Sequence, residues 1–427
     1  MCSKIEQKIP DKNYNDALSI LAVLKKSGFE AMLAGGCVRD RLMGKTPNDY
    51  DIATNARHEE VTKACMGAGF KVVPTGVDHG TVTVVAKHSA VEVTTLRVDE
   101  KTFGRKAEVR FVADFEADAA RRDFTINAMF EDATGRIYDF YGGQEHIRQQ
   151  KLVFVGDPAQ RIREDYLRIL RLFRFWSRLS YEVEDSTLVV IKREFSNLRI
   201  VSQERITSEL LGVFQGPNVV VVLEAMDKLG LLAFLLPEKS RGLESVGQFL
   251  KTNGALPRRE LAYLSLLSGC DKSAAETLAS RLKLSTEQKK ILIVASFLHT
   301  LSYDSKSLPP IGETLQFISS LEKNTFPGSF LKLYAPLWAV AFPGKQKLVD
   351  FLLDTESKVG CRRGQPMPLS GNDLMQELSL QKGTLVGELL QYLHLRFLEG
   401  EWSTNEAGLD LARTWLSRRS GNNTGRK

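Results

Sequence analysis

The sequence predicts an α/β domain followed by an elongated all-α part, and three observations support this. As far as about residue 150, short apolar stretches with strand-like alternation are interleaved with helical segments. From Asp157 onward, leucine-rich segments with a helical period follow one another almost without interruption. The length of 427 residues is also more than one compact core accommodates, so several domains are expected.

The change in pattern along the chain gives the domain boundaries that we expect. They are a head at 1–150, a helical neck at 151–215, a helical body at 216–360, a helical tail at 361–416 and a polar, disordered end at 417–427. Within the neck, body and tail, helical runs are expected at 161–180, 203–214, 219–236, 259–269, 274–300, 311–322 and 374–398.

The head is expected to begin with an amphipathic helix over residues 15–28, which ends at a glycine. Strands are expected where apolar residues alternate or cluster over strand-length stretches, at 31–34, 49–53, 81–85 and 90–94. The first strand runs directly into the glycine pair Gly35 and Gly36. Such a pair between a strand and a helix lets backbone N–H groups approach phosphate oxygens. Arg39, three residues beyond the pair, can then neutralise charge on a triphosphate.

Two carboxylates stand two residues apart in the second strand. Side chains at i and i+2 of a strand point to the same face, so Asp49 and Asp51 lie side by side. Like charges this close repel, and a divalent cation is the usual remedy. Glu92, in a separate strand, can supply a third oxygen ligand, and hard oxygen ligands favour Mg²⁺. A lone DxD also fits a solvated turn or strand edge, but its combination with GGxVRD and a later strand acid is far more specific.

The order of these motifs resembles that of one enzyme family. GGCVRD and DYDIAT are followed by RRDFTINA at 121–128 and by EDYLR at 164–168. This order resembles the class II tRNA nucleotidyltransferase and bacterial poly(A) polymerase family, a branch of the polymerase-β-like superfamily. The resemblance implies a polymerase-β-like nucleotidyltransferase fold with a mixed sheet, in which Asp49, Asp51 and Glu92 are the catalytic acids. Two metal ions at such a site would activate an attacking hydroxyl and stabilise the leaving pyrophosphate.

The RRDFTINA segment begins with two arginines followed by an acid. Under the resemblance it is the ribose motif, which separates ribose from deoxyribose through Asp123 and its neighbours Arg121, Arg122 and Asn127. A helix start with a solvated basic face is the alternative interpretation, and it does not account for so close a match to the family motif.

Residues 161–175 are predicted to form one helix that reads a nucleotide base. Asp165 and Arg168 are three residues apart and therefore share a helix face. The carboxylate can accept from the exocyclic amine of adenine or cytosine, while the guanidinium donates to the neighbouring ring nitrogen. Guanine and uracil carry a carbonyl in place of that amine, so the pair predicts selection of ATP and CTP. An ion pair on a solvated helix is the alternative for an isolated DxxR.

The same predicted helix continues with Arg171 and Arg174, which can reach the triphosphate. The match of EDYLR to the family's template motif favours the base-reading interpretation. QERITSE at 203–209 resembles the last motif that the family shares. We expect this last motif to brace the neck helices rather than to take part in catalysis.

Two further segments bear on the substrate. The charged stretch at 98–109, with its central glycine, suits a mobile loop, and a surface hairpin is the alternative. In the CCA-adding branch of the family such a loop helps to switch the site from CTP to ATP. Segments at 369–375, 383–390 and 405–407 resemble the tail that docks the tRNA elbow in that branch, which favours tRNA over poly(A) synthesis.

Bulk properties exclude some classes of protein. A net charge of +6 and a pI near 8.9 permit a polyanionic partner without requiring one. The five cysteines are widely spaced and include no CxxC pair, which indicates neither a zinc site nor a disulfide framework. Apolar runs are far shorter than the roughly 20 residues of a membrane span, and no secretory signal opens the sequence. A cytoplasmic protein is expected, with an organelle as the alternative.

The sequence thus predicts an enzyme that adds C, C and A to the tRNA 3′ end from CTP and ATP without a nucleic-acid template. Its expected partners are tRNA, CTP, ATP and Mg²⁺, with no membrane, and its oligomeric state is not indicated. A poly(A) polymerase, or an enzyme that adds only the terminal A, is the alternative within the same family. A catalytically inactive RNA-binding relative is disfavoured because the three acids and both arginine motifs are intact.

Overall fold

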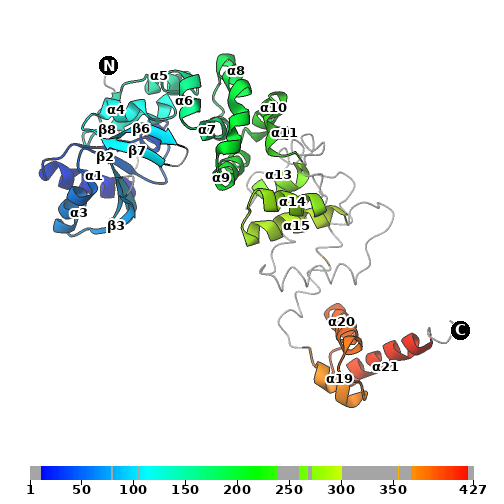
Figure 1. The fold of residues 1–427 in the computed structure, drawn as a ribbon. Helices are drawn as coiled ribbons and strands as arrows, with labels where there is room; N and C mark the ends of the chain where they lie inside the picture. Colours follow the sequence, from blue (N-terminus) through cyan, green and yellow to red (C-terminus); the bar gives the residue numbers. More distant parts are fainter. Residues whose placement is uncertain are drawn as a thin grey trace. The chain divides into compact units, whose positions relative to one another are not determined.

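The structure of the protein is a computed structural model that describes residues 11–77, 80–103, 106–237, 259–267, 272–300, 354 and 367–421 (Figure 1). By its internal contacts the chain separates into two compact units, Met1–Pro237 and Glu238–Lys427. The expected boundaries after residues 150, 215 and 360 remain predictions. The helix expected at 311–322 lies outside the described residues.

The first unit contains a seven-stranded mixed sheet in the order β3-β4-β5-β2-β1-β8-β9. Strands β2 and β5 run parallel, with Asp51 opposite Glu92, and the other neighbouring pairs are antiparallel. The predicted α/β head with a mixed sheet is therefore confirmed. The strands of the sheet are β1 (Ala31–Ala34), β2 (Asp51–Thr54), β3 (Lys71–Gly76), β4 (Thr81–Val85), β5 (Ala90–Thr95), β8 (Met129–Glu131) and β9 (Ile137–Asp139).

Each face of this sheet carries its own apolar cluster. The consecutive residues Leu33 and Ala34 belong to different clusters, as side-chain alternation along a strand requires. One cluster joins the sheet to α1 (Lys12–Lys26), α2 (Gly36–Leu42) and α3 (His58–Gly67). The other contains α4 (Phe115–Ala120), whose Phe115 ring meets Phe130 of β8 edge-on at 5.1 Å. Two short segments complete the head, the 3-10 turn η2 (Thr125–Asn127) and α5 (Gly143–Arg148).

The stretch that was expected to be a mobile loop forms a hairpin. Strands β6 (Arg97–Phe103) and β7 (Lys106–Phe111) pair in antiparallel fashion as a separate two-stranded sheet. The described residues of this stretch therefore form the hairpin that was the alternative interpretation, and the mobility of the stretch stays a prediction. Ladder hydrogen bonds join backbone groups only, so a charged stretch pairs without the apolar alternation that usually signals a strand.

The neck is helical, but its helices are shorter than the sequence suggested. The run at 161–180 is broken after Glu164, because Asp165 adopts an extended backbone with φ −150° and its carboxylate accepts from the Leu167 N–H. The run at 219–236 is broken at Gly230, which is left-handed. The helices of this part of the chain, which covers the expected neck and the start of the expected body, are α6 (Pro158–Glu164), α7 (Leu167–Leu179), α8 (Asp185–Glu194), η3 (Phe195–Ile200), α9 (Gln203–Phe214), α10 (Val219–Lys228) and α11 (Leu231–Leu235).

The second unit is also helical where it is described. The expected run at 274–300 is split near Lys283, whose φ is +48°, and the run at 374–398 is split between two helices. The expected disordered end is wrong for residues 417–421, because the last helix continues to Gly421 and Arg419 pairs with Glu388 of the preceding helix. The helices are α13 (Arg259–Leu267), α14 (Lys272–Arg281), α15 (Thr286–Thr300), α19 (Gly371–Glu377), α20 (Thr384–Glu399) and α21 (Asn405–Gly421).

We expect Gly216→Ala to destabilise the first unit. Gly216 follows α9 where it lies against α7, and a Cβ there would overlap the backbone carbonyl of Ser177. Because the obstacle is backbone, the free energy of unfolding should fall by about 1–3 kcal/mol, measured by urea unfolding followed by circular dichroism. Gly67→Ala is the matched control, since a Cβ on this last residue of α3 meets none of the described atoms within 4 Å. Equal stability of both variants would contradict the close approach of α7 and α9.

Candidate active site

A single cleft of about 770 Å³ in the first unit brings the predicted site residues together. Its wall is formed by the strand ends of the head, the segment around η2 and the first turns of α7. Every residue singled out from the sequence lines it: Gly35, Gly36, Arg39, Asp49, Asp51, Glu92, Arg121, Arg122, Asp123, Asn127, Asp165, Arg168, Arg171 and Arg174.

The two aspartates face the cleft from the start of β2. Asp49 and Asp51 are exposed, whereas Tyr50 between them is 2% exposed and points into the core. This is the alternation that the i, i+2 spacing predicts. The strand itself begins only at Asp51, two residues later than predicted, so Asp49 lies in the loop before it. Because β2 and β5 are parallel and in register, Glu92 stands beside Asp51 on the neighbouring strand.

The cleft raises the pKa of Asp51 to about 6. The Asp51 side chain remains accessible from the cleft, but the protein atoms around its carboxylate displace part of its hydration, and this contributes most to the raised pKa. The negative charges of Glu92 and Asp49 add to it. The positive charge of Arg122 acts in the opposite direction. The acids therefore repel one another in the absence of a cation, which is the electrostatic condition that a bound metal ion relieves.

The glycine pair forms a tight passage from β1 into α2. Gly35 has φ +75° and precedes the first turn of α2, a conformation that side chains other than glycine rarely adopt. A Cβ at this position would also come within 2.8 Å of the Arg122 guanidinium. The pair therefore lets a cationic side chain and the backbone N–H groups of α2 approach the same part of the cleft.

Arg39, which was predicted to neutralise charge on a triphosphate, is buried and already hydrogen-bonded within the protein. The residue is 3% exposed, and its guanidinium donates to the Asp40 carboxylate at 2.7 and 2.9 Å and to the Asn127 side-chain oxygen at 2.7 Å. In this structure Arg39 thus ties α2 to the RRDFTINA segment, and a triphosphate would have to compete for its donors.

The arginines of the RRDFTINA segment are held by an acid that the sequence did not single out. Asp118, on α4, accepts from Arg121 through one oxygen and from Arg122 through the other, at 2.6 to 3.1 Å. Burial alone would raise the pKa of Asp118, but Arg122 and Arg121 hold it below its usual value. Only the spacing of three and four residues on a short helix hints at this role.

Asp123 joins the head to the neck. Its Oδ2 accepts two hydrogen bonds from Arg171 of α7, at 2.6 and 2.8 Å, while Oδ1 accepts from the Phe124 N–H and the Asn127 side chain. Burial opposes ionisation of Asp123, yet the pKa of the carboxyl lies below its usual value because of Arg171. Asp123, which was predicted to recognise the ribose, and Arg171, which was predicted to reach the triphosphate, are therefore hydrogen-bonded to each other in this structure.

The last shared motif, QERITSE, also reaches the cleft. Glu209 of α9 forms an ion pair with Arg174 at 2.6 Å and a longer one with Arg171 at 3.6 Å. Arg205, one helical turn earlier, pairs with Asp165 at 2.7 Å. These contacts agree with the expectation that the motif braces the neck. The residues that it holds, Asp165, Arg171 and Arg174, are also those expected to bind the nucleotide.

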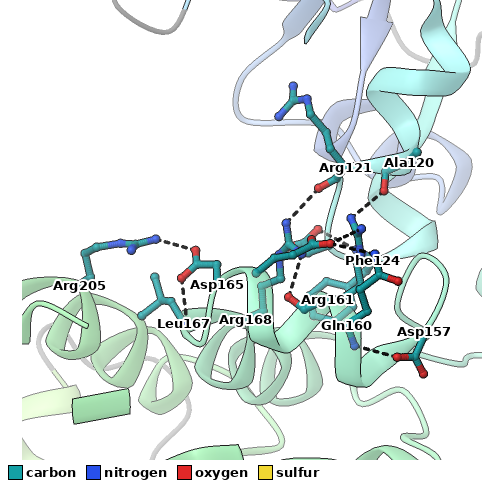
Figure 2. A network of polar contacts seen from close by, with 12 residues as sticks. Ala120, Arg121, Phe124, Asp157, Gln160, Arg161, Asp165, Leu167, Arg168 and Arg205 are labelled. Atoms are coloured by element: carbon teal, nitrogen blue, oxygen red, sulfur yellow. Dashed lines mark hydrogen bonds and ion pairs between the residues drawn. The ribbon is translucent and has the colours of Figure 1, made fainter. Parts of the chain in front are cut away.

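The predicted base-reading pair does not share a helix face. Figure 2 shows Asp165 in the break between α6 and α7, held by Arg205 and by the Leu167 N–H. Arg168 lies on the next helix, and its guanidinium donates to the backbone carbonyls of Arg121 and Arg161. The prediction of one continuous helix is wrong here because the backbone at Asp165 is extended, although both side chains still line the cleft.

Known proteins share this architecture. The domain family described as "Poly A polymerase head domain" matches residues 31–153, and the one described as "Probable RNA and SrmB- binding site of polymerase A" matches residues 180–242. The mitochondrial CCA tRNA nucleotidyltransferase 1 of Danio rerio is 35% identical over 387 residues, which cover 89% of this chain and 86% of the relative. The chain belongs to the class II CCA-adding enzyme family.

Other members agree with this family assignment. The CCA-adding enzyme of Bacillus cytotoxicus is 31% identical over 401 residues, which cover 91% of this chain and 95% of the relative. The crystal structure of the Bacillus stearothermophilus CCA-adding enzyme in complex with CTP superposes with a TM-score of 0.78 at 27% identity, covering 96% of this chain and 100% of that one. The resemblance inferred from the motifs is confirmed.

CCA-adding enzymes are nucleotidyltransferases, a class that generally uses a divalent metal ion, and the acids of the cleft fit one. Among the described residues, no three His, Cys, Asp or Glu side chains are placed to hold a metal by themselves. Two carboxylates are nevertheless the protein share of many sites whose other ligands are substrate phosphates and water. Asp49 and Asp51 offer two carboxylates of this kind in the cleft, and Glu92 adds negative charge beside them.

In the metal-free protein, we expect the Asp51 carboxyl to titrate near pH 6 rather than near the usual value of about 4. Glu92→Gln removes a neighbouring negative charge, so the midpoint should move to lower pH. The measurement is carbon NMR of the aspartate carboxyls, with the Asp51 signal assigned through Asp51→Asn. Asp132, in the turn after β8, is the internal reference and should not respond to Glu92→Gln. An Asp51 midpoint that ignores Glu92→Gln would contradict the arrangement of these acids.

Proposed function

We propose that this protein adds C, C and A to the 3′ end of tRNA, using CTP and ATP and no nucleic-acid template. The observation that carries the proposal is the cleft, which unites two aspartates at a strand end, a glycine turn and neck residues suited to reading a base. Relatives of similar length that are named CCA tRNA nucleotidyltransferase and CCA-adding enzyme support it.

We assign Asp49 and Asp51 as ligands of Mg²⁺, because their hard carboxylate oxygens suit this ion. A bound metal of this kind lowers the pKa of an attacking hydroxyl and neutralises charge on the leaving pyrophosphate. The tRNA 3′ hydroxyl attacks the α-phosphorus of the nucleotide, a new P–O bond forms, and the bond to pyrophosphate breaks in line. The protein acts chiefly by orienting both substrates. Glu92 keeps the local field negative, which strengthens the attraction for the cation.

We assign the triphosphate to the part of the cleft near the start of α2. Gly35, Gly36 and Cys37 line the cleft where α2 begins, so the backbone N–H groups of its first turn are close to it. Arg122 lies directly beside Gly35. Arg171 and Arg174 approach from α7, where their charges are shared with Asp123 and Glu209. A bound triphosphate would form ion pairs with Arg171 and Arg174 in place of some that they now form with Asp123 and Glu209. Its binding therefore competes with these ion pairs inside the protein.

Asp123 is placed to recognise the ribose. It lies at the junction of η2 and α7, and its two oxygens already bind Arg171, Asn127 and a backbone N–H. A carboxylate offers about four acceptor positions, and the four hydrogen bonds from these groups occupy them, so a ribose hydroxyl would have to replace one of them. The 3.3 Å bond from the Asn127 side chain is the longest of the four. A sugar that lacks this hydroxyl could not make the exchange and would forgo a hydrogen bond to a charged acceptor, which disfavours deoxyribose.

Base selection rests on Asp165 and Arg168. Asp165 is held through both oxygens by Arg205 and the Leu167 N–H, which leaves acceptor capacity for the amine of cytosine or adenine. Among the described residues, the Nε–H of Arg168 and one N–H on its Nη2 have no hydrogen-bond partner, and a ring nitrogen can accept from them. Uracil and guanine would set a carbonyl against the Asp165 carboxylate, which disfavours them.

The helical tail is proposed to bind the body of the tRNA. Helices α20 and α21 carry Arg396, Arg413, Arg418 and Arg419, which suits a phosphate backbone. The cytoplasm is the proposed location, with an organelle as the alternative because some relatives are named mitochondrial. In the described part of the chain, no helix is long and apolar enough to cross a membrane.

The test of the proposed function is the product formed on a tRNA that lacks its 3′ CCA. We expect incorporation of two C residues from CTP followed by one A from ATP, and little incorporation from UTP or GTP. Product length and composition are measured with each labelled nucleotide alone and in combination. Incorporation of ATP alone would instead indicate an A-adding enzyme, and a long A tract would indicate a poly(A) polymerase.

Asp165→Ala should relax the choice of base. The loss of one acceptor that matches the amine is worth about 1–3 kcal/mol, so the ratio of kcat/KM for CTP over UTP should fall by roughly 5- to 150-fold. Arg163→Gln is the matched control, because Arg163 lies on α6 and pairs with Glu194 without lining the cleft. An unaltered CTP/UTP ratio in Asp165→Ala would count against the base-reading role.

A further inference from the structure

A buried polar cluster lies behind the two aspartates, on the side of Tyr50 that faces the core. It consists of Asp11, Tyr14, Arg41, Tyr50 and Glu131, and we refer to it as the Glu131 cluster. Of its members, only Tyr50 belongs to the catalytic segment. None of the five lines the cleft. None of the five side chains has a role in the proposed reaction.

Glu131 is the centre of the cluster and is fully buried on β8. Its carboxylate accepts from Arg41 at 3.0 and 3.1 Å and from the Tyr14 hydroxyl at 3.0 Å. The Arg41 guanidinium also lies 3.8 Å from the centre of the Tyr14 ring. A buried ion pair contributes little to stability once its desolvation is counted, but it fixes geometry because its partners cannot separate without leaving a buried charge unpaired.

Tyr50 connects this fixed cluster to the metal-binding segment. Its hydroxyl donates to Asp11 at 2.5 Å and interacts with the Arg41 guanidinium. The other oxygen of Asp11 accepts from the Asn13 N–H and caps α1. Arg41 lies in the last turn of α2, the helix that begins at the glycine pair. The Tyr50 hydroxyl is thereby joined to α1, to α2 and, through Arg41, to β8.

This connection matters most for Asp49. The ladder partners of β2 begin at Asp51 on the β5 side and at Ile52 on the β1 side, so Asp49 precedes the ladder. Asp49, Asp51 and Glu92 line the same cleft, with Glu92 directly opposite Asp51 on the neighbouring strand, so their like charges push the carboxylates apart. The side chain of Tyr50, one residue from each acid, is the nearest buried anchor for the backbone between them.

We propose that Tyr50 is a positioning residue, whose bonded hydroxyl fixes the separation of Asp49 and Asp51 so that both can bind one cation. The inference rests on the proposed function, because it takes these acids to be metal ligands. Tyr50 itself touches no substrate. Its contribution is to hold the carboxylates ready against their mutual repulsion, in the manner of groups that orient metal ligands from behind.

Tyr50→Phe tests this, since it keeps the ring and removes only the hydroxyl. The readout is the Kd for Mn²⁺, measured by electron paramagnetic resonance on the full chain without nucleotide. We expect Kd to rise about tenfold, which is the lower end of the effect for residues that support metal ligands. The Mg²⁺ concentration for half-maximal incorporation should rise in parallel. Thermal unfolding of each variant reports whether the fold is retained.

Tyr14→Phe is the matched control, because it removes a hydroxyl from the same cluster at a residue far from the aspartates in sequence. Its Kd for Mn²⁺ should stay within about twofold of the original, whereas Tyr50→Phe should not. Unchanged Mn²⁺ binding in Tyr50→Phe, or equal weakening in both variants, would overturn the inference while leaving the proposed function intact. If Asp51→Asn bound Mn²⁺ as tightly as the original protein, the metal assignment of the proposed function would fail, and this inference with it.

Discussion

Mutual repulsion among carboxylates is the constraint around which this cleft is built. Parallel pairing of β2 with β5 sets Asp51 beside Glu92, and Asp49 lies two residues away on the same side. Such a grouping is unfavourable in an isolated protein, and the raised pKa of Asp51 records that cost. The arrangement becomes favourable only when a cation and a polyphosphate enter together, which makes the cleft complementary to the bound substrate rather than to solvent.

The arginines of the cleft differ from its catalytic acids in one respect. Whereas Asp49, Asp51 and Glu92 repel one another, most of the arginines already form ion pairs with acids before any ligand binds. Nine arginines and seven carboxylates line the cleft, so only a small positive excess faces an incoming triphosphate. Asp118, Asp123 and Glu209 each hold one or two of these arginines in place. The pair of Asp123 with Arg171 crosses from the head to the neck, as do the bonds from Arg168 and Arg161 to the backbone before Asp123. Orientation of the nucleotide thus depends on how these two parts meet.

The sequence predicted those features of the structure that depend on residues close together in the chain. Strands β1, β2, β4 and β5 were predicted because apolar alternation reports burial, and the site residues were found because their types and spacing match a known motif order. Information about partners distant in sequence was absent. Asp165, at the break, pairs with Arg205, forty residues later. Arg39 was expected to neutralise charge on a triphosphate, whereas in the structure the Asn127 side chain accepts from it. Glu131 lies buried in a strand, where nothing in its sequence neighbourhood announces Arg41 or Tyr14.

The central claim is that Asp49 and Asp51 carry the chemistry and leave RNA binding to other parts of the chain. The most direct measurement is single-turnover incorporation of CMP into tRNA lacking its CCA end, made alongside the Kd for that tRNA, with both aspartates replaced by Ala. The account predicts that incorporation falls below detection while the Kd for tRNA stays close to that of the original protein. Incorporation at an undiminished rate would contradict it.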